Sequence, residues 1–351
     1  MPRPQSSCSS GSRGTSETRD MASSVSFVSG QSPRHVPWAL LAGSATGSTW
    51  VNHVLSSDPC CVSVGEYLMA NKTAAKLFAS AGKQAIARVL LDVVARNKEE
   101  LRRREEASGR RCTSTAGGVK LKLAERDITF GTDGVGNAAA VADALHTLGF
   151  QVILLQRSNH LDNVLGRLSR RKTGVLHCLA NGSDVGVAGR KARAARSCTP
   201  EKLNTSLTIS CAAAKRTIDR LRLRKRASEL LFTRDRWPRG DAANDGSGRV
   251  LRLEYEALVE RPQQWLSALR LLRLPAQSAC LLQHEHRKRV VQTQRELITN
   301  WHAFAPCMRR AGHVYAQLLQ PDKRPASGVL PIDNPTLCPP ARAGKLRPLS
   351  L

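Results

Sequence analysis

The sequence is poor in three things. Aromatic residues make up 4% of its 351 residues, only 28 residues are Asp or Glu against 54 Lys and Arg, and no apolar run reaches the length of about 18 residues that a membrane helix needs. We therefore expect no transmembrane segment. The shortage of acidic residues leaves a formal net charge of +26. This charge indicates either an anionic partner, such as a nucleotide, an anionic substrate or nucleic acid, or a basic bias spread over solvated faces.

Metal-binding and redox motifs are also missing. None of the ten cysteines forms a C-x-x-C pair, and no Cys/His group has the spacing of a zinc site. His284, Glu285 and His286 lie too close together in sequence to hold a metal by themselves. The scattered cysteines predict reduced, mostly buried thiols in a soluble intracellular protein without a metal site.

Composition divides the chain into three parts. Residues 1–35 are rich in Ser, Gly and Arg, lack the apolar core of a secretory signal, and predict a disordered extension that faintly resembles an organelle transit segment. Residues 36–320 carry periodic apolar patterns and predict one folded domain. Residues 321–351 are rich in proline without periodicity and predict a disordered tail. Neither the compartment nor the oligomeric state can be read from these patterns.

The most informative stretch is 38–50. An apolar segment from Trp38 is followed by the small-residue turn Gly43 to Gly47, and a helix is predicted from Ser48. A strand, a glycine turn and a helix N-terminus together form a cradle for a phosphate group. The turn lacks the Walker spacing, and Ser48 stands where that motif has lysine, so nucleotide hydrolysis is disfavoured.

The remaining patterns predict alternating strands and helices, and hence a P-loop-like α/β fold in which helices cover both faces of a central parallel sheet. Strands are expected near 61–64, 118–123, 151–156 and 249–253. Helices are expected over 73–106, 138–148, 161–168, 199–231, 262–271 and 295–319, with a polar loop over 107–116 and a surface insertion over 173–199.

Five short motifs occur in one order along this framework. They are Thr46-Gly47-Ser48-Thr49-Trp50, Gly65-Glu66, Gly118-Val119-Lys120, the segment Ile153 to Leu161, and Leu253-Glu254-Tyr255-Glu256-Ala257-Leu258 with Pro262. In this order and spacing the sequence resembles sulfotransferases that use 3′-phosphoadenylyl sulfate (PAPS), particularly the plant and algal group related to the nodulation sulfotransferases.

The resemblance implies a sulfotransferase that moves a sulfuryl group from PAPS to an acceptor hydroxyl on a carbohydrate, an anionic glycan among them, or on a small alcohol, without a metal. It implies Glu66 as the catalytic base. It assigns PAPS binding to residues of the first turn and of the segment after residue 156, namely Ala45, Thr46, Gly47, Ser48, Thr49, Trp50, Arg157, Ser158, Asn159 and Gly166.

The chain departs from the family pattern at three of these positions, which marks it as a divergent member. Ala45 stands where the family has a basic residue, Ser158 where it has a phosphate-binding arginine, and Gly166 where it has a serine. Candidates for the missing charge are Lys120, Lys122 and the basic cluster of Arg167, Arg170 and Arg171. A catalytically impaired homologue is therefore also consistent with the sequence.

Two different functions are suggested by the residues themselves. The segment Gly134 to Ala139 fits G-x-G-x-x-A, and Arg157 ends the next predicted strand, which together would suit an NADP-binding oxidoreductase. The net charge alone would suit a basic nucleic-acid-binding protein. That partner is disfavoured because basic–aromatic interleaving, zinc spacing and RNA-binding motifs are all missing.

Overall fold

The central sheet contains five parallel strands. The computed structural model describes residues 34–80, 82–109, 111–123, 128–129, 136–174, 178–179, 205–233, 249–261, 263–275, 278, 286–287 and 292–323. The sheet has the order β2-β3-β1-β4-β6. Its strands are β1 (Arg34–Ala42), β2 (Cys61–Ser63), β3 (Ser114–Lys122), β4 (Gln151–Gln156) and β6 (Val250–Glu254).

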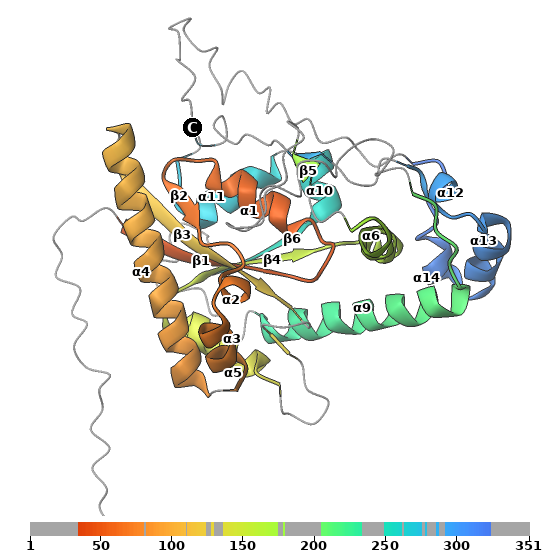
Figure 1. Ribbon diagram of the computed structural model, residues 1–351, viewed down its shortest axis with the longest axis horizontal. Helices are drawn as coiled ribbons and strands as arrows, with labels where there is room; N and C mark the ends of the chain where they lie inside the picture. The colour runs from red at the N-terminus through yellow and green to blue at the C-terminus, as the bar shows by residue number, and fades with distance from the viewer. Residues whose placement is uncertain are drawn as a thin grey trace, which may run out of the picture. The chain divides into compact units, whose positions relative to one another are not determined.

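Alternate residues of β1 face the two layers of helices. Ala39 and Leu41 pack with α3 (Lys72–Ser80), α4 (Lys83–Ser108) and α5 (Ala138–Thr147) on one face. Trp38 and Leu40 pack with α1 (Ser48–Ser56), α10 (Tyr255–Glu260) and α11 (Gln264–Leu271) on the other. Figure 1 shows these two groups of helices on opposite sides of the strands. The predicted three-layer α/β fold with a central parallel sheet is confirmed.

The close pairing of β1 with β3 depends on a glycine. Trp38 pairs in register with Gly118, and a Cβ atom added at Gly118 would lie only 2.1 Å from the Trp38 ring. The indole therefore packs directly on the bare backbone of β3, where it is fully buried. The motif Gly118-Val119-Lys120 therefore begins with glycine because a larger residue would clash with Trp38.

A third apolar cluster lies beyond the β4 side of the sheet. It joins α6 (His160–Thr173), α9 (Cys211–Leu231), α13 (Trp301–Arg310) and α14 (His313–Ala316). The remaining described elements are the short helices α2 (Tyr67–Ala70) and α12 (Gln294–Leu297) and the antiparallel strands β5 (Cys178–Leu179) and β7 (His286–Arg287). None of the described helices is long and apolar enough to cross a membrane.

Several predicted boundaries were wrong. The expected helix over 73–106 is divided into α3 and α4, and the expected loop over 107–116 contains the start of β3. The helix expected from residue 199 begins at Cys211, because Leu207 pairs its backbone with Leu297 and Thr299 and Ser210 then caps the helix. Residues 199–204 lie outside the described residues, as do most of 173–199.

The last helix was also mispredicted. Instead of one helix over 295–319, the structure has α12, α13 and α14. The first break allows Ile298 to pair with Leu207, and the second is at Gly312, whose φ of +123° suits glycine. The predicted disordered ends lie outside the described residues except for 34–35 and 321–323, so those boundaries stay predictions.

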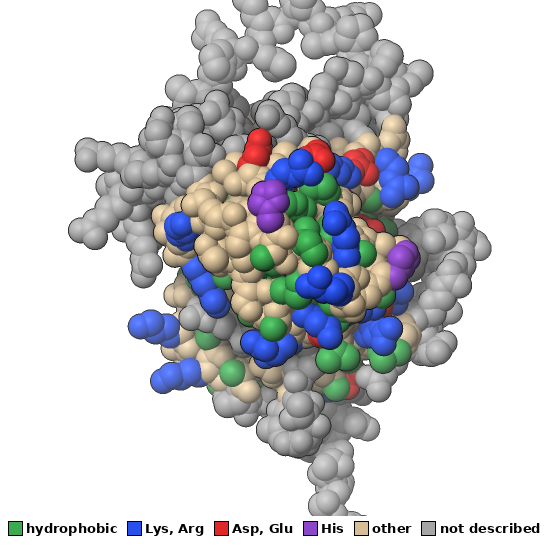
Figure 2. Space-filling view, turned by 90° about the vertical axis from the view of Figure 1, so that its right-hand side faces the viewer, with side chains coloured by type: hydrophobic (Ala, Val, Ile, Leu, Met, Phe, Trp, Pro, Cys, Tyr) green, Lys and Arg blue, Asp and Glu red, His purple; other side chains and the backbone are tan. Residues whose placement is uncertain are grey.

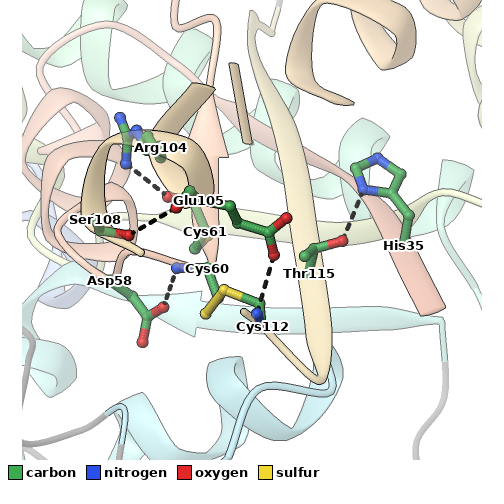
Figure 3. Close-up of a disulfide and its surroundings, with 9 residues drawn as sticks. All are labelled: His35, Asp58, Cys60, Cys61, Arg104, Glu105, Ser108, Cys112 and Thr115. Atoms are coloured by element: carbon green, nitrogen blue, oxygen red, sulfur yellow. Dashed lines mark hydrogen bonds between the residues drawn. A yellow bond between two sulfur atoms is a disulfide. The ribbon is translucent and has the colours of Figure 1, made fainter. Parts of the chain in front are cut away.

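The expectation of reduced cysteines was wrong for four of them. Cys60 forms a disulfide with Cys112, and Cys211 forms one with Cys307. Figure 3 shows the first disulfide beside the amino ends of β2 and β3. Among the described residues the buried Cys61 is a free thiol, and burial raises its pKa. Disulfides of this kind persist in oxidising compartments, so the cysteines no longer favour an intracellular location.

Replacing Cys112 with serine should lower the free energy of unfolding by ~2–4 kcal/mol in non-reducing buffer, because the unfolded chain loses a cross-link. Urea denaturation would measure the difference. In reductant, which also opens Cys211–Cys307 in both proteins, wild type and variant should have the same free energy of unfolding. A difference that persists in reductant would show that the side chain at position 112 acts through packing instead.

Candidate functional site

The candidate site lies where the carboxyl ends of all five parallel strands meet. Each strand contributes residues at or just after its last position: Gly43 to Gly47 after β1, Glu66 after β2, Lys120 and Lys122 at the end of β3, Arg157 and Ser158 after β4, and Tyr255 and Glu256 after β6. Because β1 is flanked by later strands on both sides, its carboxyl end is the place where open α/β sheets bind ligands.

The turn after β1 has an unusual backbone. Ala45 has φ +59° and Gly47 has φ +82°, both in the left-handed region. Three hydrogen bonds hold the turn. The Thr46 hydroxyl donates to the Gly43 carbonyl at 2.8 Å, the Arg157 Nη1 donates to the Ala45 carbonyl at 3.1 Å, and the Arg167 Nη2 donates to the Ser44 carbonyl at 3.4 Å. A left-handed alanine persists only where its surroundings fix it. The strain is therefore concentrated where the resemblance expects a ligand.

Gly47 brings the turn against the aromatic layer below it. A Cβ atom at Gly47 would lie 2.3 Å from the Tyr255 ring. Trp50 packs edge-on against both Tyr255 and Trp265, at ring-centroid distances of 5.6 and 5.4 Å. Trp50 is nearly buried, so its part in the site is to support the turn from beneath.

Gly47 is also the N-cap of α1, and as a glycine it has no side chain with which to cap the helix. The first N–H groups of a helix have no partners within the helix, and the helix dipole favours an anion beside them. The turn and the first residues of α1, including Ser48 and Thr49, therefore have the geometry of an anion cradle.

Two ammonium groups reach this cradle from β3. The Lys120 Nζ lies 2.8 Å from the Thr49 hydroxyl and 2.7 Å from the Glu66 carboxylate. The Lys122 Nζ lies 3.5 Å from the Ser48 hydroxyl and 3.2 Å from the same Glu66 oxygen. Alternate residues of a strand point to the same face, which brings both lysines to one spot. They supply beside the turn the positive charge that is missing at Ala45.

Glu66 is held ionised by these lysines. Burial by itself raises the pKa of this carboxyl, but the two nearby ammonium charges and their hydrogen bonds outweigh burial and lower the pKa to about 2. The side chain of Lys120 is only 4% exposed, so this cation depends on its carboxylate partner. One carboxylate shared by two lysines leaves a local charge of +1 at this end of the site.

The opposite end of the site, at β4 and β6, has a different charge pattern. The Glu256 carboxylate accepts hydrogen bonds from Arg157 Nε and from the Ser158 N–H and hydroxyl, each at 3.0 Å. Asp162 lies 3.6 Å from the same guanidinium, which also stacks on the Tyr255 ring. Arg157 therefore has two carboxylates as neighbours.

The remaining predicted binding residues have structural contacts. Asn159 caps α6 by accepting from the Asp162 N–H, and its amide donates to the Leu318 carbonyl. Gly166 faces the turn, where an added Cβ atom would lie 3.6 Å from the Ala45 Cβ. The sequence did not predict the contacts of Glu256 with Arg157 and Ser158. The place of Glu256 directly after a strand was the available signal.

The dinucleotide fingerprint has less support. Gly134 and Val135 lie outside the described residues. The fingerprint also needs a strand of the sheet before it. Ile128, which precedes Gly134, makes a single isolated bridge to Leu123 and is not part of the five-stranded sheet. Among the described residues no group of three or more His, Cys, Asp and Glu side chains has the geometry of a metal site.

Comparisons with known proteins add little. No family model and no curated protein sequence matches this chain. Among solved structures, the sulfotransferase domain from the olefin synthase of Synechococcus PCC 7002 matches with a TM-score of 0.34 and 13% identity, covering 82% of this chain and 88% of that chain. A likeness this distant carries no argument about function, which depends on the side chains at the site.

Lowering the pH should weaken the fold through Glu66. Its folded pKa of about 2 lies below its ordinary value of 4.5, so its contribution is complete above pH 4.5 and is lost as the pH falls toward 2. The free energy of unfolding, measured by urea denaturation, should fall between pH 6 and pH 3 in both proteins. The fall should be smaller in Glu66→Gln than in the wild type by ~1–2 kcal/mol. The exposed Glu260→Gln is the control. An equal loss in wild type and Glu66→Gln would refute the assignment.

Proposed function

We propose that the protein transfers a sulfuryl group from an adenosine 5′-phosphosulfate donor of the PAPS type to an acceptor hydroxyl. The observation that supports this most directly is the meeting of two lysines, one carboxylate and an N-terminal helix turn at the end of β1. The cradle suits the 5′-phosphate of the donor, and the lysines suit the oxygens of the transferring group. The motif order in the sequence supports the same assignment.

Glu66 is the candidate base in this reaction. The acceptor hydroxyl loses its proton to Glu66 and attacks sulfur, the bond between sulfur and the bridging phosphate oxygen breaks, and the nucleotide phosphate leaves. With a pKa of about 2, Glu66 is ionised but weakly basic. Donor oxygens that attract Lys120 and Lys122 would reduce the charge acting on Glu66 and raise its pKa. Donor binding would thereby make Glu66 a stronger base.

The acceptor is proposed only by class. A carbohydrate or small alcohol would provide the hydroxyl, and the surplus of cations would favour an anionic glycan. Exposed basic side chains lie on α6, α9 and α13. They include Arg170, Arg171, Lys215, Arg309 and Arg310. Figure 2, which views the molecule from the right-hand side of Figure 1, shows Lys and Arg side chains distributed over that face. Such a face attracts polyanions at low salt.

The test is acceptor-dependent formation of adenosine 3′,5′-bisphosphate (PAP) from PAPS. Purified full-length protein would be incubated with PAPS and a panel of monosaccharides, sulfated oligosaccharides and short alcohols, and PAP would be measured by ion-pair chromatography. Glu66→Gln should reduce turnover by ~10²–10⁴ without weakening nucleotide binding, because both lysines are kept and lose a competing carboxylate. Lys122→Met should reduce turnover by ~10²–10³ and weaken nucleotide binding.

The control for the lysine variant is Lys98→Met, an exposed residue of α4 away from the site. It removes the same charge from the protein and should leave turnover unchanged. If neither PAP nor any other adenine nucleotide binds the wild-type protein at millimolar concentration, the proposed function is wrong.

A further inference from the structure

We propose that this protein recognises the donor ribose through free hydroxyl groups, with Glu256 as the residue that disfavours a 3′-phosphate. The inference rests on the proposed function and concerns the end of the same site formed by β4 and β6. The donor would therefore be read by its 5′-phosphosulfate, and PAPS would have no advantage over adenosine 5′-phosphosulfate.

The first step is the direction of the nucleotide. The 5′-phosphate lies at the turn after β1, and the sulfuryl group must point to Glu66 and the lysines on the β2–β3 side. The ribose then extends to the other side of β1, where β4 and β6 end. The groups that meet its hydroxyls are those around Arg157, whose guanidinium already contacts the turn at the Ala45 carbonyl.

The second step is that an internal anion already uses the hydrogen-bond donors at this end. A phosphate bound after β4 would need the guanidinium of Arg157 and the N–H and hydroxyl of Ser158. All three donate to the Glu256 carboxylate at 3.0 Å. A phosphate would have to displace Glu256 from these donors and remain beside its negative charge. A ribose hydroxyl, in contrast, can donate to a carboxylate, as acidic residues accept from ribose in dinucleotide sites.

The third step is the balance of charge. Arg157 lies beside both Glu256 and Asp162, and Lys225 nearby pairs with Glu254. Arg167 donates to Asn163 and to the Ser44 carbonyl, and its charge brings this end of the site close to neutral. At the lysine end, by comparison, two cations share Glu66. The site is thus positive where the 5′-phosphosulfate lies and close to neutral where the ribose lies.

The side chains at two further positions agree with this assignment. Ser158 places a short neutral group where the resemblance implies an arginine, and Gly166 places none where it implies a serine. An added Cβ atom at Gly166 would lie 3.6 Å from Ala45, which is ordinary contact. Packing therefore permits a Cβ atom at this position.

The test compares two nucleotides that differ only by the 3′-phosphate, AMP and PAP. Titration calorimetry on the full-length protein should give an AMP affinity equal to or higher than the PAP affinity. Glu256→Gln removes the charge with little change in shape, and it should raise the ratio of PAP to AMP affinity by about tenfold or more. AMP that lacks the 3′-hydroxyl should bind the wild type more weakly than AMP.

Glu260→Gln is the matched control, because it removes a carboxylate from the same helix, α10, that pairs with Lys323 instead of Arg157. It should leave the ratio unchanged. A second variant, Ser158→Arg combined with Gly166→Ser, should also raise the ratio toward PAP without removing Glu256. Thermal unfolding of each variant would show that the fold is kept.

The outcomes separate the two proposals. If the wild type binds PAP at least tenfold more tightly than AMP, or if Glu256→Gln leaves the ratio unchanged, the ribose inference is wrong while the sulfotransferase proposal stands. Loss of a PAP preference on Arg167→Ala would then identify Arg167, which lies beside Ser44, as the phosphate ligand. If the wild type binds neither nucleotide, both proposals fail.

Discussion

The site depends on β1 being the inner strand of a parallel sheet. Its neighbours β3 and β4 run in the same direction on its two sides, so the turn after Ala42 lies between the carboxyl ends of both. That arrangement requires β1 to be buried on both faces, and its residues from Trp38 to Ala42 are fully buried. If β1 lay at an edge, the lysines of β3 and the arginine after β4 could not approach the same turn.

The two ends of the site differ in how their charged side chains are paired. Glu66 forms ion pairs with two lysines, whereas Arg157 forms ion pairs with two acidic side chains. Each arrangement satisfies buried or half-buried charges, since an isolated ion in this environment would be costly. In the proposed function, the same pairing that stabilises the fold would favour anion binding at β3 and hydroxyl binding at β4 and β6.

The disulfide between Cys60 and Cys112 makes the strands that carry part of the site sensitive to reduction. Cys60 and Cys112 join the amino ends of β2 and β3, and the carboxyl ends of the same strands carry Glu66 and the two lysines. A cross-link at one end of a short parallel pair limits relative movement of the strands at the other end. The relative positions of Glu66, Lys120 and Lys122 therefore depend in part on the disulfide between Cys60 and Cys112, which are 52 residues apart in sequence.

The alternation of strands and helices, the glycine turn and most of the residues near it could be predicted from the amino-acid sequence. Buried strands such as 151–156 contain continuous apolar runs, and Gly43 and Gly47 mark a turn. Those features depend on neighbouring residues, so a single sequence is enough to predict them. Helix limits near Cys211 and Asn300 were missed because backbone pairing of Leu207 with residues about 90 positions away competes with the helix.

The ion pairs between charged side chains, in contrast, became known from the tertiary structure. The helices α2, α3 and α4 separate Glu66 from Lys120 and Lys122 in sequence. Glu256 lies 99 residues from Arg157, so no spacing predicts either pair. The cysteine pairs were likewise hidden, because their partners are 52 and 96 residues apart. Local patterns determine elements and turns, whereas the partner of a side chain depends on the order and direction of strands that the whole chain must form together.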